Sequence, residues 1–245
     1  MILDNGYLYG LGAFETIAIK SGTPIFLTEH LTRLHKALRF LQIGRTVTAE
    51  AVGAAIQAEG VSHGALRLTM SEHNTLFTFR ENPYTEDIYQ RGFRLHFCDA
   101  LRNDASPLTY HKTLNYGDCI LEKRKCTNMG YDEGIFQNHR GEICEGTTSN
   151  IFFVKGNTIL TPALTCGLLP GILRAYLQGR YDITEAVIKT EEIADFDECF
   201  VTNSLLGIMP VTSLGDVQFA AQEAAMRLQR EYVECIQRMR STDGR

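Results

Sequence analysis

Apolar positions recur along this chain in two periods, one typical of helices and one typical of strands. Helical spacing of four leucines predicts a helix from Thr28 to about Leu41 with one buried face, made by Leu31, Leu34, Leu38 and Leu41. A second helix is expected over 48–59, ended by Gly60. The runs ALRLTM and TLFTF predict two antiparallel strands, and FRLHFC predicts a further strand. The first hundred or so residues therefore form a small α+β unit.

A polar stretch with a proline, RNDASPLTY at 102–110, separates this unit from the rest. Helices are expected after it from Tyr116 to about Met129 and over 219–240. Between them, short apolar runs predict strands at 134–137, 142–145, 151–154 and 158–161. We predict an α+β protein of two domains: 1–104 a small α+β domain, 105–111 a linker, and 112–245 a large domain.

Composition narrows the class of protein. The chain has 245 residues, 44% of them hydrophobic, which is enough for a substantial core. Its formal net charge is −5, and no basic block stands out, so nucleic acid is not an expected partner. No apolar run approaches the ~20 residues that a membrane helix needs. The start, MILDNGYLYG, lacks the pattern of a signal peptide, so a cytoplasmic location is expected.

Cysteine and histidine spacing argues against a metal site. The seven cysteines are odd in number and form no C-x-x-C pair, and the seven histidines are scattered. His30 and His35 are five apart, which is the wrong spacing for a metal pair on one helix face. Reduced, buried thiols are the expected state.

Two charged side chains stand in segments that suit chemistry. Lys112 in YHKTLNYG lies just before a predicted helix among aromatic and apolar residues, where a lysine can act as a nucleophile or base. A solvated linker lysine is the alternative. Glu145 precedes Gly-Thr-Thr-Ser-Asn150, and a carboxylate held there could accept a hydrogen bond from a protonated ring nitrogen. The alternative is an exposed glutamate in a turn.

Two further segments suit phosphate binding. In GLLPGILR, a helix is expected to start near Pro170, with its first backbone N–H groups aimed at one point. Thr202-Asn203-Ser204, at a predicted strand end, offers hydroxyl groups. Each segment alone could be an ordinary turn or helix start. An amine, a carboxylate and two phosphate-binding turns together meet the requirements of pyridoxal 5'-phosphate (PLP).

The ordered motifs YGLGAFETI, HLTRL, HKTLNYG, GYDEGIF, EGTTSNIFFVKGNTILTP, GLLPGILR and FVTN resemble those of the class IV aminotransferases, the fold-type IV PLP enzymes. The resemblance runs from Tyr9 to about Val211. It implies a small α+β domain, a larger barrel-like β domain with helices, the cofactor between them, and a homodimer.

The resemblance also implies roles for individual residues. Lys112 forms the Schiff base with PLP, and Glu145 holds the ring nitrogen. Arg33 falls on a phosphate-binding arginine, and Tyr116 lies near the place of a tyrosine that binds the ring hydroxyl. The other cofactor-binding positions are Asn150, Gly171, Ile172, Leu173, Asn203 and Ser204.

Within the family, several positions favour the aminodeoxychorismate lyase branch. Leu173 stands where branched-chain and D-amino acid aminotransferases usually have threonine, and TNSLLGIMPV resembles the lyase pattern. The implied reaction converts 4-amino-4-deoxychorismate to 4-aminobenzoate and pyruvate. A branched-chain or D-amino acid aminotransferase is the alternative, and a binding module without catalysis is a third. SEHNTLFTF and Leu11-Gly12 depart from the family pattern at segments that can border the substrate.

Overall fold

The computed structural model describes residues 1–242, and the side chains up to residue 238. The chain divides into two compact units. Unit 1 contains Met1–Pro83 and His111–Tyr116, and unit 2 contains Tyr84–Tyr110 and the chain from Gly117 onward. Each unit mixes helices and strands, so the predicted α+β class is confirmed.

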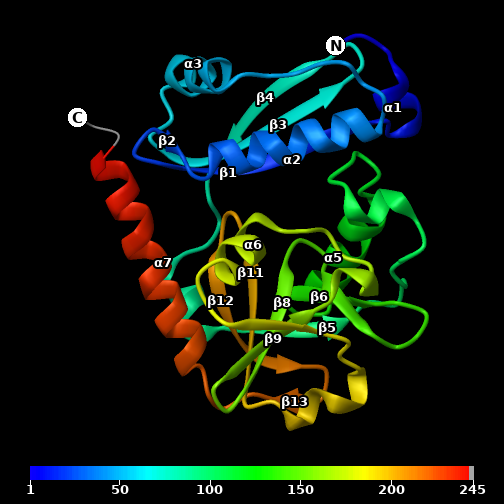
Figure 1. The fold of residues 1–245 in the computed structure, drawn as a ribbon, viewed down its shortest axis with the longest axis vertical. Coiled ribbons are helices and arrows are strands. Elements are labelled where there is room, and N and C mark those ends of the chain that lie inside the picture. The colour runs from blue at the N-terminus through cyan, green and yellow to red at the C-terminus, as the bar shows by residue number, and fades with distance from the viewer. Residues whose placement is uncertain (243–245) are drawn as a thin grey trace. The chain divides into compact units, whose positions relative to one another are not determined.

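Unit 1 is a four-stranded antiparallel sheet with a helix across one face (Figure 1). Its strand order is β2-β1-β3-β4. The strands are β1 (Gly12–Lys20), β2 (Thr23–Pro24), β3 (His63–Ser71) and β4 (Thr75–Arg80), and the helices are α1 (Asn5–Tyr9), α2 (Leu27–Phe40) and α3 (Ala49–Glu59).

Helix α2 covers the sheet because its leucines line one side. Leu31, Leu34 and Leu38 are buried against the strands, as the spacing predicts. The helix begins one residue before Thr28, after Phe26 in a left-handed conformation, and no side chain caps it. Thr48 caps α3 through the Ala51 N–H, and Gly60 ends α3 with a φ of 71°.

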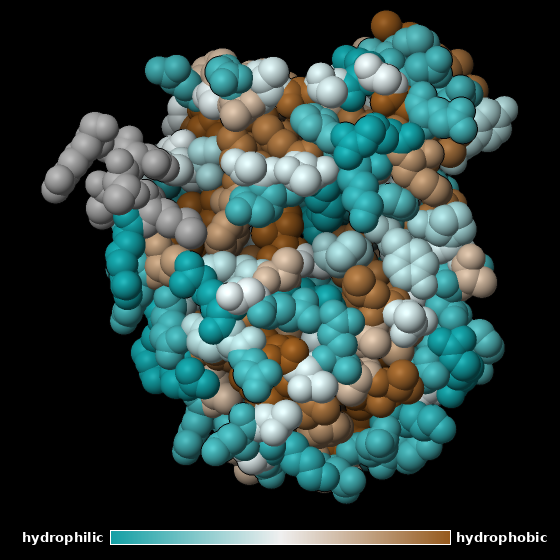
Figure 2. Space-filling model, viewed as in Figure 1, coloured by the Kyte–Doolittle hydropathy of each residue, from teal (hydrophilic) through white to brown (hydrophobic). Residues whose placement is uncertain are grey.

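Apolar side chains of the N-terminal segment and α1 are exposed: Met1, Ile2, Leu3, Tyr7, Leu8 and Tyr9. Figure 2 shows scattered brown atoms among teal ones at the upper right, where α1 lies in Figure 1. The Asp4 carboxylate holds this segment to β3. It accepts hydrogen bonds from the Gly6 N–H at 2.9 Å and the Ser71 hydroxyl at 2.6 Å.

Unit 2 is built on a nine-stranded mixed sheet that curls into a half-barrel (Figure 1). The strand order is β10-β9-β8-β11-β12-β5-β6-β7, with β13 beside β12. The strands are β5 (Phe93–Phe97), β6 (Glu133–Gln137), β7 (Ile143–Gly146), β8 (Asn150–Lys155), β9 (Thr158–Pro162), β10 (Ile183–Ala186), β11 (Glu198–Asn203), β12 (Gly207–Leu214) and β13 (Val217–Gln218).

Within residues 84–242, unit 2 has four helices, and the longest packs along β11 and β12. They are α4 (Glu86–Arg91), α5 (Gly117–Asn128), α6 (Ile172–Gln178) and α7 (Glu223–Thr242). Short 3₁₀ turns lie at Pro107–Tyr110, Leu164–Cys166 and Thr190–Asp195. The core packs aromatic and aliphatic side chains of the sheet, including Phe153, Val201 and Met209.

The domain boundary differs from the predicted one. The first break falls at Pro83, whereas the sequence placed it after residue 104, and His111–Tyr116 returns to unit 1. The reason is β5, which pairs in parallel with both β12 and β6 and so belongs to the large sheet. Pairing between strands so distant in sequence leaves no local signal, and the polar stretch at 102–110 was mistaken for the boundary.

Candidate active site

In unit 1, Lys112 lies over two aromatic rings. The Lys112 carbonyl accepts the Phe14 N–H at 3.0 Å, which fastens the 111–116 segment to the end of β1. The Lys112 Nζ is 4.6 Å from the centre of the Phe14 ring and 5.1 Å from that of Tyr116. The two rings meet edge to face. These contacts orient the half-buried amine and give the predicted pair, Lys112 and Tyr116, a common location.

A second cation lies against the same phenylalanine. The Arg67 Cζ of β3 is 3.8 Å from the centre of the Phe14 ring. Burial lowers the pKa of Arg67, because the surrounding protein disfavours its charged form. Arg67 could not be predicted from the sequence, since nothing there distinguishes it from an ordinary strand residue. The Arg67 cation beside Lys112 suits a substrate that carries a carboxylate.

Arg33 is held by a fully buried carboxylate. Its Nε donates to Glu15 Oε1 at 2.8 Å, and its Nη2 donates to Oε2 at 2.7 Å. His30 Nδ1 lies 2.7 Å from the same Oε2. Burial favours the neutral form of Glu15, but Arg33 and His30 outweigh burial and bring its pKa to about 2. The fork fixes the guanidinium of Arg33, whose phosphate-binding role stays a prediction.

In unit 2, Glu145 lies on β7 and is buried between donors on both of its oxygens. Arg102 Nε donates to Oε1 at 3.0 Å, Arg102 Nη2 donates to the same oxygen, and the Leu169 N–H donates to Oε2 at 3.0 Å. The alternative of an exposed glutamate in a turn is therefore wrong for Glu145, which is 4% exposed.

The small hydroxyl residues after Glu145 bind another carboxylate, which the sequence analysis missed. Glu133 of β6 is fully buried and accepts the hydroxyls of Thr147 and Thr148, the latter at 2.8 Å. Lys123 Nζ donates to it at 3.1 Å. Burial lowers the proton affinity of Lys123, but Glu133 outweighs it, so the pKa of Lys123 is raised. These bonds fix the turn after β7.

The two predicted phosphate-binding turns, GLLPGILR and Thr202-Asn203-Ser204, are hydrogen-bonded to the segment that follows Glu145. The Asn150 Nδ2 donates to the Leu169 carbonyl at 3.0 Å, and Gly171 packs against the Asn150 side chain so closely that a Cβ would come within 1.9 Å of Oδ1. Ile172 and Leu173 begin α6, and no side chain caps this helix. The N–H groups at its start are therefore suited to an anion.

The second turn follows β11. The Asn203 Nδ2 donates to the Thr148 carbonyl at 3.2 Å, and its Oδ1 accepts the Leu205 and Leu206 N–H groups, both at 2.9 Å. Asn203 thus ties this turn to the loop after Glu145, and Ser204 lies half-buried in it. The hydroxyls of Ser149 and Thr202 are buried, with no hydrogen-bond partner among residues 1–242.

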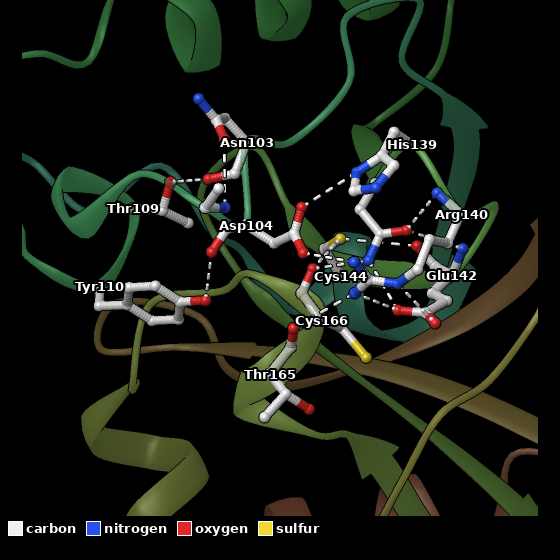
Figure 3. Close-up of polar contacts among 12 residues, drawn as sticks. Asn103, Asp104, Thr109, Tyr110, His139, Arg140, Glu142, Cys144, Thr165 and Cys166 are labelled. Carbon is white, nitrogen blue, oxygen red and sulfur yellow. Dashed lines mark hydrogen bonds and ion pairs between the residues drawn. The ribbon is translucent and has the colours of Figure 1, made fainter.

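An ion-pair cluster supports β7 from the side (Figure 3). Arg140 Nη1 donates to Asp104 at 2.6 Å, while its Nε and Nη2 donate to Glu142 at 2.9 and 2.7 Å. The Arg140 hydrogen bond lowers the pKa of Asp104 and brings that of Glu142 to about 2, although burial acts in the opposite direction. The Cys144 thiol donates to the Cys166 carbonyl at 3.0 Å. The cluster joins β7 to the segment before GLLPG.

Each unit, taken by itself, has residues that suit part of PLP chemically. An amine held over aromatic rings suits an aldehyde, and a buried carboxylate with fixed donors suits a protonated ring nitrogen. Buried hydroxyls without partners and an uncapped helix start suit phosphate oxygens. Among the residues described, no group of histidines, cysteines and carboxylates could hold a metal ion. No helix in the described part of the chain could cross a membrane.

Comparisons with known proteins agree with these features. The family profile described as "Amino-transferase class IV" matches residues 12–214. The chain therefore belongs to the class IV amino-transferase family. Members of this family are PLP-dependent enzymes, so the protein is an enzyme of that class and the third alternative, a binding module without catalysis, is wrong.

Individual relatives carry two kinds of name. The aminodeoxychorismate lyase of Bacillus subtilis is 29% identical over 96% of this chain and 89% of its own. The solved 4-amino-4-deoxychorismate lyase of Pseudomonas aeruginosa has a TM-score of 0.82 at 27% identity, covering 94% of this chain and 93% of its own. A relative in Methanocaldococcus jannaschii named for branched-chain-amino-acid aminotransferase activity is 26% identical over 86% of this chain and 81% of its own.

Proposed function

We propose that the protein is a PLP-dependent 4-amino-4-deoxychorismate lyase, which forms 4-aminobenzoate and pyruvate. The observation that carries the proposal is the near full-length similarity to proteins of that name, both in sequence and in solved structure. The cation Arg67 at the Phe14 ring supports it, because the substrate has two carboxylates. The reaction consumes no second substrate, and its aromatic product would supply folate synthesis.

Lys112 is the proposed proton carrier. Its amine takes the proton from the amine-bearing carbon of the substrate. The ether C–O bond then breaks, and the amine returns a proton to the departing enolpyruvate, which becomes pyruvate. When bound, PLP supplies the electron sink for the pair released at that carbon. The Phe14 and Tyr116 rings hold the Lys112 side chain in one orientation, so its amine meets the reacting carbon repeatedly in the same geometry.

The other predicted residues are proposed to hold and orient the cofactor. Glu145 accepts a hydrogen bond from the protonated ring nitrogen, and the Tyr116 hydroxyl forms a hydrogen bond with the ring oxygen. Arg33, the first N–H groups of α6 at Ile172 and Leu173, and the Ser204 hydroxyl bind phosphate. Asn150, Gly171 and Asn203 shape the loops that present these groups, as their hydrogen bonds and close contacts support. We further propose a homodimer.

An aminotransferase is the second candidate, because relatives named for that activity match most of the chain. One assay separates the two. The purified protein is loaded with PLP and given 4-amino-4-deoxychorismate without any 2-oxo acid. We expect pyruvate and 4-aminobenzoate in equal amounts. If turnover requires an added 2-oxo acid, the lyase proposal is wrong and the aminotransferase takes its place.

The assay needs matched variants to tie product to this chain. Lys112→Ala is the negative control, since it removes the proposed proton carrier. Lys155→Ala removes an exposed lysine at the turn between β8 and β9, and it is expected to retain wild-type activity.

A further inference from the structure

Arg102 is a charged partner of the buried Glu145 carboxylate, and no motif of the sequence singled it out. The backbone of Arg102 is held beside the end of β6, because the Arg102 N–H donates to the Gln137 carbonyl at 2.7 Å. Its guanidinium then lies over the buried Phe136 ring, with Cζ 4.9 Å from the ring centre. The side chain is 17% exposed and that of Glu145 is 5% exposed, so solvent screens their attraction little.

The contacts divide the two oxygens of Glu145 between different donors. Arg102 uses two N–H groups, Nε and Nη2, on Oε1, whereas the Leu169 backbone N–H donates to Oε2. The third arm of the guanidinium, Nη1, donates to the Cys119 sulfur at 3.4 Å. Donors on both oxygens fix the plane of the carboxylate, and the two guanidinium bonds to Oε1 stabilise its ionised form.

Burial opposes the charge on Arg102, but Glu145 and Cys119 outweigh it, and the net effect raises the pKa of Arg102. The guanidinium of Arg102 is therefore cationic at neutral pH. A buried glutamate without such a partner tends to take up a proton, because burial disfavours its charged form.

We propose that Arg102 is a positioning residue that decides where the shared proton lies in the hydrogen bond between Glu145 and the cofactor's ring nitrogen. This inference rests on the proposed function. The proton in such a bond lies on the partner with the higher proton affinity. The Arg102 fork lowers the proton affinity of the carboxylate, so the proton lies on the nitrogen and the ring is cationic. Without the fork, the proton moves to Glu145 and the ring becomes neutral.

The test is ¹⁵N NMR of the holoenzyme loaded with PLP that is ¹⁵N-labelled at the ring nitrogen. Wild type is expected to show the chemical shift of a protonated ring. Arg102→Gln keeps one donor for Oε1 but removes the charge, and its signal is expected to move towards that of a neutral pyridine. Arg102→Lys keeps the charge and is expected to stay near wild type. Arg91→Gln, which loses an exposed pair with Asp132, is the matched control and should not move.

A protonated ring in Arg102→Gln would overturn the inference, as would a neutral ring in wild type. If Arg102→Gln does not fold, Arg102→Met tests the same loss of charge with a side chain that still covers Phe136. Failure of the proposed function gives a different result. In that case wild type either binds no PLP or binds it and makes no 4-aminobenzoate without a 2-oxo acid.

Discussion

Lys112 is oriented by a backbone hydrogen bond and by contacts with two aromatic rings. Its carbonyl is bonded to β1, and its amine lies over Phe14 and Tyr116. The contacts come from residues close to it in sequence or from the adjoining strand, so removing the side chain leaves the backbone attachment in place.

We therefore expect Lys112→Ala to lose activity by about a thousandfold or more, since both the amine that would bind PLP covalently and the proton carrier are lost. The fold should remain, as checked by circular dichroism and thermal unfolding. Lys155→Ala serves as the control. Activity within a few-fold of wild type would exclude Lys112 from the assigned role.

Glu145→Gln keeps the shape of the side chain and removes its charge. We expect PLP to remain bound and the rate to fall by about a hundredfold or more, because the ring nitrogen loses its charge partner. Cofactor content is measured by absorbance and the rate by pyruvate release. An unchanged rate would remove Glu145 from the active site.

The sequence predicted Glu145 but not its partner. Glu145 lies in a motif whose order the family shares, whereas Arg102 is 43 residues away in a stretch that reads as a polar linker. Only the pairing of Arg102 with the end of β6 brings the two together. Glu133 was missed for a similar reason, because its role depends on hydroxyls that follow another strand.

At the scale of elements, the start of α6 depends on a close approach between two backbone segments. A Cβ on Gly171 would lie 1.9 Å from the Asn150 Oδ1, and Asn150 is buried and bonded to Leu169. Gly171→Ala should therefore displace Asn150, reduce the stability by about 1–3 kcal/mol and weaken PLP binding. Denaturant unfolding and PLP titration measure the two effects.

Gly179→Ala is the control at the other end of the same helix. Its Cβ would make only ordinary contacts, the shortest at 3.4 Å, so both quantities should stay near wild type. Equal behaviour of the two alanine variants would contradict the proposed packing of Gly171.

Strand β7 depends on the Asp104–Arg140–Glu142 cluster. Arg140 depresses the pKa values of both carboxylates below their unfolded values, and that of Glu142 to about 2. The stabilisation is therefore present above about pH 5 and is lost as the pH falls through the folded pKa values.

Arg140→Met should lower the melting temperature at pH 7, and the difference from wild type should shrink as the pH falls towards 3. Arg180→Met, which loses an exposed arginine of unit 2, should show no such convergence. A difference between wild type and Arg140→Met that stays constant from pH 7 to pH 3 would rule out the ion pairs as its cause.

At the scale of the whole molecule, the α+β class and most elements follow from local patterns. Helix α3 shows this well, because Thr48 and Gly60 mark its ends by local chemistry. The division into two units cannot be predicted from local sequence patterns. Strand β5 looks like the end of the small domain, yet parallel pairing with β12 and β6 places it in the large sheet.

The exposed apolar side chains of the N-terminal segment and α1 are consistent with a contact surface. We expect a homodimer, with a solution mass twice the chain's 27.5 kDa by light scattering. A solution mass equal to that of one chain at all concentrations would contradict the proposed dimer. It would leave the proposed role of Lys112 unchanged.

The central claim is that one amine of this chain, that of Lys112, carries the cofactor. Borohydride reduction of the coloured protein, followed by peptide mass spectrometry, tests it directly. We predict a single pyridoxyl adduct, on the peptide containing Lys112. An adduct on another lysine, or none after loading with PLP, would contradict the account.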